Sequence, residues 1–97
     1  MITPSQCRAA RALIGWSQLQ LADAARVGVV TVRQFEAGAS EPRNATLDVM
    51  TRALEGAGVI FQAEGQSVDG GPGVRLKRRL AEAGGLLLDE LNAANDG

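Results

Sequence analysis

The segment from Ser17 to Gly38 constrains the fold most strongly, because it encodes two short helices joined by a tight turn. Ser17 and Gln20 match a capping box, in which each side chain bonds the backbone N–H of the other at a helix start. A second helix is predicted over residues 28–37, since Gly38 is the residue type that commonly follows a helix end. Its predicted buried face carries Val27, Val32 and Phe35. Its predicted outer face carries Val29, Val30, Arg33 and Ala37, with Thr31 and Gln34 at the edges.

Helices are also predicted on both sides of this segment. The first begins at Pro4-Ser5 and stops at Gly15, and the last is capped by Asn44 and ends at Gly56 and Gly58. Both have an apolar stripe at helical spacing. The stripes consist of Cys7, Ala10 and Ile14 in the first helix, and of Leu47, Met50 and Leu54 in the last.

The pattern changes after residue 58. Residues 59–63 and 74–77 are predicted as strands on either side of a glycine-rich loop. The tail, residues 78–97, can form a helix with Leu80, Leu87 and Leu91 inward, although two adjacent glycines disfavour it. We therefore predict a compact, mainly α domain of four to five helices with a C-terminal β hairpin or strand pair. The chain divides into a helical domain, residues 1–58, and a C-terminal extension, residues 59–97.

The composition argues against an enzyme. The 97 residues include no histidine and one cysteine, Cys7, so the commonest general base, the commonest zinc ligand and an intrachain disulfide are missing. No apolar run approaches the about 20 residues of a membrane span. No secretory signal is seen either. We expect a soluble, cytoplasmic bacterial protein without metal or cofactor.

Charge is distributed unevenly although the net charge is only −1. Residues 1–43 contain five arginines and three acidic residues, and the tail from residue 81 is acidic. A basic cluster lies between these parts, at Arg75, Lys77, Arg78 and Arg79. We interpret this cluster as a solvated strand edge rather than as a DNA-binding arm.

Residues 5–57 resemble the lambda-repressor-like (Cro/C1, XRE) helix-turn-helix family. The matching residues are Arg11, Ser17, Gln18, Leu21, Ala22, Ala25, Val27, Thr31, Val32, Phe35, Glu36, Gly38, Pro42, Thr46, Leu47 and Leu54. Residues 58–77 resemble an extension found in many short bacterial members. The chain departs from the family at Arg26, where glycine is usual and a left-handed backbone is implied, and at Gly28, where serine or threonine usually caps the helix.

The resemblance implies which residues meet double-stranded DNA. Gln18 contacts a phosphate and supports the recognition helix, residues 28–37, which enters the major groove. The positions that face bases are Gly28, Val29, Val30, Thr31, Arg33 and Gln34. Arg33 suits guanine and Gln34 suits adenine, whereas the valines suit only thymine methyl groups. Ser40 with its neighbouring backbone amides, and Arg43, are expected to hold phosphates. Arg11 and Glu36 are assigned to a partly buried ion pair of the scaffold.

These features predict a sequence-specific transcriptional regulator, associated with the nucleoid when bound. We expect a homodimeric repressor that binds an inverted repeat and dimerises through the extension. The alternative is an antitoxin that represses its own operon and binds a toxin, or a co-regulator, through the leucine-bearing acidic tail, residues 80–91. A third interpretation is a protein-interaction module without DNA binding. The apolar Val29 and Val30 favour this module, and Gln18 and Arg33 oppose it.

Overall fold

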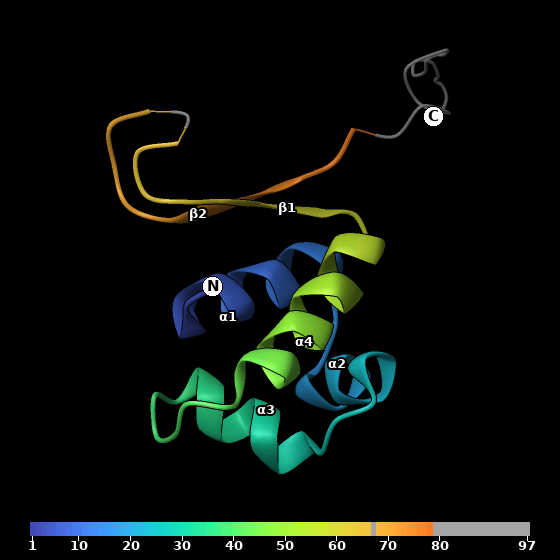
Figure 1. Ribbon diagram of the computed structural model, residues 1–97. Helices are drawn as coiled ribbons and strands as arrows, with labels where there is room; N and C mark the ends of the chain where they lie inside the picture. The colour runs from blue at the N-terminus through green and yellow to red at the C-terminus, as the bar shows by residue number, and fades with distance from the viewer. Residues whose placement is uncertain (67, 79–97) are drawn as a thin grey trace, which may run out of the picture.

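The computed structural model describes residues 1–66 and 68–78. Within them, four helices precede one antiparallel strand pair (Figure 1). The elements are α1 (Pro4–Ile14), α2 (Gln18–Ala25), α3 (Val29–Glu36), α4 (Asn44–Gly56), β1 (Val59–Gln62) and β2 (Gly73–Leu76). The predicted fold class, a mainly helical domain with a C-terminal hairpin, is therefore confirmed. The expected tail helix and its leucines lie outside the described residues.

Capping boxes start the first two helices. Ser17 and Gln20 form the predicted one at α2, and Thr3 and Gln6 form another at α1. The prediction that Asn44 caps α4 was wrong, because Arg43 occupies the N-cap position and Asn44 is already helical. No side-chain hydrogen bond caps α4, so burial of its apolar stripe, rather than a local cap, determines where this helix lies.

The turn between α2 and α3 is built around Arg26. Its φ of 59° is left-handed, and no other non-glycine among the described residues has a positive φ. This conformation costs a non-glycine residue about 1–2 kcal/mol. Val27 continues the turn by donating its N–H to the carbonyl of Ala22 at 3.0 Å. The expected turn is thus present without the usual glycine, and packing of α2 against α3 holds it.

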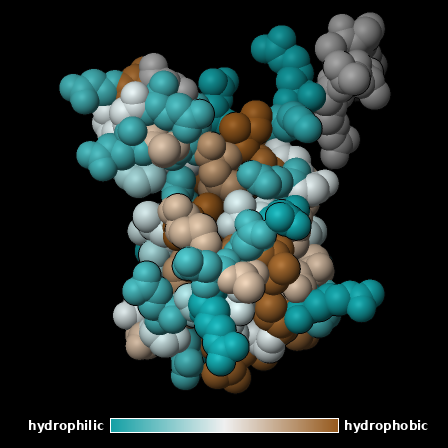
Figure 2. All heavy atoms as spheres, in the orientation of Figure 1, coloured by the Kyte–Doolittle hydropathy of each residue, from teal (hydrophilic) through white to brown (hydrophobic). Residues whose placement is uncertain are grey.

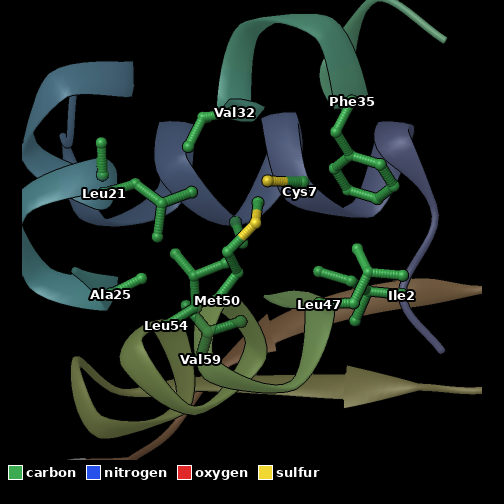
Figure 3. Packing of buried hydrophobic residues seen from close by; sticks show 12 residues of the cluster. Ile2, Cys7, Leu21, Ala25, Val32, Phe35, Leu47, Met50, Leu54 and Val59 are labelled. Carbon is green, nitrogen blue, oxygen red and sulfur yellow. The ribbon is translucent and has the colours of Figure 1, made fainter. Parts of the chain in front are cut away.

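All four helices and β1 contribute to a single hydrophobic core. Figure 3 shows Cys7 of α1, Leu21 of α2, Val32 of α3 and Met50 of α4 converging on its centre, where each is buried. The further buried members are Ile2, Ala10, Ala22, Ala25, Phe35, Leu47, Leu54 and Val59. The apolar stripes of α1 and α4 lie where the sequence predicted them, apart from Ile14, which is only partly buried.

The hairpin lies along α1 and α4, on the side of the molecule that faces away from α3 (Figure 1). Val59 pairs with Leu76, and Phe61 with Val74. Phe61 and Val74 pack against the helical core. β1 ends one residue before the prediction because the N–H of Ala63 turns to the side chain of Gln66, and β2 is displaced one residue toward the N-terminus.

Gln6 joins α1 to both strands of the hairpin. Its side chain is buried, and its amide nitrogen donates to the carbonyl of Gln62 at 3.0 Å and to that of Gly73 at 2.9 Å. The amide oxygen accepts from the backbone of Thr3 at 2.9 Å. One side chain therefore both caps a helix and anchors the C-terminal hairpin.

We expect Gln6→Ala to reduce the free energy of unfolding by about 2 kcal/mol more than Gln20→Ala does. Both variants lose a capping box, but only Gln6→Ala removes a donor from two carbonyls of the hairpin. Urea denaturation followed by circular dichroism measures the two losses. Equal losses would show that the contact between α1 and the hairpin adds no stability.

Candidate nucleic-acid interface

α3 lies at the end of the molecule opposite the hairpin (Figure 1), and its outward side carries exposed residues. Val32, Phe35 and Glu36 point inward and are buried. Arg33 and Gln34 are exposed, and neither side chain makes an ion pair or hydrogen bond with another described residue. Their donors and acceptors are therefore available to a ligand.

The apolar part of this face is smaller than the sequence predicted. Val30 is 50% exposed, but Val29 is only partly exposed and packs against the core. The prediction that Val29 lies on the open face was thus wrong, because packing against the helical core covers part of its side chain. Thr31 is also half-buried, and Gly28 is the exposed N-cap of α3. In Figure 2 hydrophobic atoms appear at the lower end of the molecule, where α3 lies.

The expected phosphate contacts flank α3. Gln18 is the first residue of α2 and is half-buried, while Ser40 and Arg43 are exposed between α3 and α4. The backbone N–H groups of Ala39 and Ser40 donate to the carbonyl of Gln34 at 2.8 and 3.4 Å. These two amides therefore do not point outward as expected, because they close the end of α3.

Four side-chain hydrogen bonds converge on the carboxylate of Glu36. Arg11 donates Nε to Oε2 and Nη2 to Oε1, both at 2.7 Å. Gln18 Nε2 donates to Oε1 at 3.0 Å, and Cys7 Sγ to Oε2 at 3.1 Å. Arg8 donates to the backbone carbonyl of Glu36. The expected Arg11–Glu36 ion pair thus belongs to a network that joins α1, α2 and α3.

The network keeps the carboxylate ionised although Glu36 is only 2% exposed. Burial raises the pKa of Glu36, but the hydrogen bonds from Arg11, Gln18 and Cys7 outweigh it and hold that pKa below its ordinary value. The hydrogen bond to Glu36 also raises the pKa of Arg11. Burial, and then the bond to Glu36, raise the pKa of the Cys7 thiol, which stays protonated and able to donate.

The comparison with known families agrees with this geometry. The sequence model of a family described as helix-turn-helix matches residues 8–56, from the second turn of α1 to the last residue of α4. The chain belongs to the lambda-repressor-like (Cro/C1, XRE) helix-turn-helix family. It is a DNA-binding transcriptional regulator. A comparison with curated proteins found no match. No helix in the described part of this regulator is long and apolar enough to cross a membrane.

Sequence reasoning missed several residues that organise the regulator. It placed Cys7 in the core without its bond to Glu36, and it gave no role to Gln6 or Arg8. One signal was available, since Cys7 and Arg11 are four residues apart and so lie on the same face of a helix. The hairpin partners of Gln6 and the Glu36 partner of Arg8 lie 28 or more positions away, beyond the reach of local patterns.

We expect Glu36→Gln to lower the free energy of unfolding by about 2–3 kcal/mol at neutral pH, because the ion pair with Arg11 is lost. A carboxyl with a lowered folded-state pKa stabilises above its ordinary value of 4.5, and this stabilisation is lost as the pH falls through the folded-state pKa. The difference between wild type and Glu36→Gln should therefore shrink in acid. Urea titrations across this pH range measure it, with exposed Glu55→Gln as the matched control. A difference that stays constant in acid would show that folding does not lower the pKa of Glu36.

Proposed function

We propose that this regulator is a homodimeric repressor that reads an inverted-repeat operator with α3 in the major groove. The outward face of α3 carries the proposal, because Arg33 and Gln34 are exposed there without partners among the described residues. Their backbone, in contrast, is held by the buried side of the same helix. A rigid helix with uncommitted polar side chains suits the reading of base edges.

The chemistry of each position indicates which bases it would meet. The Arg33 guanidinium can donate to O6 and N7 of one guanine, and the Gln34 amide can pair with N6 and N7 of one adenine. Val30 can contact a thymine methyl group, as can the more buried Val29 from the edge of the face. Gly28 lets the backbone approach closely, and Thr31 supplies a hydroxyl. The binding surface is therefore specific at few positions, which is a reason for a second half-site.

The flanking polar residues are proposed to contact phosphates. Gln18 is the first residue of α2, before α3 in the chain, and Arg43 is the N-cap of α4, after α3. The Ser40 hydroxyl is exposed in the loop that leads to Arg43. Phosphate contacts on both sides of a recognition helix set its register without carrying sequence information.

We expect Arg33→Ala to weaken binding to the DNA upstream of the regulator's own gene by about 5- to 150-fold, the range for one bidentate base contact. Binding to random DNA should change little. Fluorescence anisotropy at two salt concentrations measures both. Arg43→Ala should instead weaken both DNAs equally and reduce the salt slope by about 1.

Arg52→Ala is the matched control, because Arg52 is an exposed arginine of α4 that pairs with Asp48. If Arg33→Ala binds the upstream DNA as wild type does, Arg33 does not read that operator. If the wild-type protein binds the DNA upstream of its own gene no better than random DNA, that DNA does not contain the operator.

The hairpin supports the proposal of a homodimer. A two-stranded sheet has two open edges, which invite pairing with another strand. β1 contains no charged residue, and Ile60 within it is 41% exposed, whereas β2 and its continuation carry Arg75, Lys77 and Arg78. Like charges would face each other if two β2 strands met at a two-fold axis. We therefore place the dimer contact on β1, which leaves α3 of both copies at the opposite end (Figure 1).

We expect Ile60→Lys to convert the dimer to a monomer, because two lysines would face each other near the axis. Sedimentation velocity measures the mass, and anisotropy on one half-site and on the full operator measures the consequence. The full operator should lose affinity, and one half-site should not. Val68→Lys, at an exposed loop position, is the control. A monomeric wild type, or a dimer that survives Ile60→Lys, would contradict this contact.

A further inference from the structure

We propose that Glu36 is a positioning residue that sets the polarity of the Gln18 amide, so that its second N–H points outward to donate to a DNA phosphate. This inference rests on the proposed function only in naming phosphate as the acceptor. In this proposal the buried carboxylate of Glu36 both positions α3 and orients the Gln18 side chain on α2.

The first step is that the carboxylate cannot rotate away. Arg11 holds both of its oxygens with hydrogen bonds of 2.7 Å, and Cys7 donates to Oε2 at 3.1 Å. Arg8 donates to the backbone carbonyl of the same residue. Oε1 therefore meets Gln18 from a fixed position, and the Gln18 Nε2 lies 3.0 Å away from it.

The second step is that only one orientation of the amide is compatible with this neighbour. An ionised carboxylate accepts hydrogen bonds and donates none, whereas a glutamine amide has a donor end and an acceptor end. A flipped amide would place its oxygen against Oε1 of Glu36, and two acceptors would face each other. Gln18 must therefore turn its nitrogen toward Glu36.

The third step concerns the remaining hydrogen. The Gln18 nitrogen carries two, and Glu36 uses one of them. Gln18 is half-buried, and its side chain makes no other hydrogen bond with a described residue. Phosphate oxygens, like carboxylate oxygens, only accept. The outward N–H is thus a donor of the right polarity for the DNA backbone, held in place before DNA arrives.

A double-mutant cycle in the full chain tests the coupling. It consists of Gln18→Met, Glu36→Gln and the double variant, each measured by anisotropy on the upstream DNA and on random DNA. We expect Gln18→Met to weaken both DNAs by about tenfold, as for one hydrogen bond to a charged group. Its salt slope should not change, because a neutral donor displaces no counterion, in contrast to Arg43→Ala.

Glu36→Gln should weaken binding several-fold, because an amide at position 36 accepts either orientation of Gln18. In the Gln18→Met background the same change should weaken binding by a smaller factor, because only its effect on the placement of α3 remains. If Glu36→Gln weakens binding by the same factor in the wild-type and Gln18→Met backgrounds, the inference is overturned, because the loss then reflects a general loss of structure. A phosphate contact forms on DNA of any sequence, so the cycle on random DNA tests the coupling even if the upstream DNA is not bound preferentially. That outcome would contradict only the proposed operator.

Side-chain amide NMR gives a second readout that does not depend on variant stability. In the free wild-type protein, one Gln18 amide proton should be shifted downfield by the carboxylate, relative to those of Gln20, whose amide oxygen serves the capping box. Adding random DNA should move the other Gln18 proton. If the first shift is missing, Glu36 does not orient the amide, and if DNA moves neither proton, phosphate is not the acceptor.

Discussion

The carboxylate of Glu36 is the constraint on which the helical arrangement depends. An ion taken out of water costs several kcal/mol unless its hydrogen-bonding capacity is filled. Here the donors come from Cys7 and Arg11 on α1 and from Gln18 on α2. No single helix supplies them all, so the carboxylate is satisfied only when α1, α2 and α3 have their native positions. An apolar residue of similar size could fill the space, but it would accept many more arrangements.

The buried side of α3 holds the helix in place, and its outward side is left free of this task. The helix has eight residues, too few to be stable alone, and its buried side provides the packing that holds it. Val32 and Phe35 supply apolar burial, and Glu36 supplies the polar anchor. Arg33 and Gln34, on the outward side, make no side-chain hydrogen bond or ion pair with another described residue. A substitution at either position would therefore leave the buried side of α3 in place.

Much of this design can be read locally. The capping box at Ser17 and the apolar stripes of α1 and α4 follow from residue type and spacing, because neighbours within four positions create them. The left-handed Arg26 was implied only by the family resemblance. The burial of Val29 and the cap of α4 at Arg43 do not follow from residue type and spacing, because packing between helices decides them. The run of residues 29–32 even has high β propensity, and it is helical because its buried side fits the core formed by α1, α2 and α4.

The amino-acid sequence by itself thus determined the order of the helices, the turn between α2 and α3, and the exposure of Arg33 and Gln34 on α3. Only the tertiary structure decided which polar groups distant in the chain meet. Gln6 is 56 positions from Gln62 and 67 from Gly73, and Cys7 is 29 from Glu36. A buried polar group must find a partner wherever the fold brings one. The hairpin anchor and the Glu36 network are therefore properties of the folded chain and not of any local pattern.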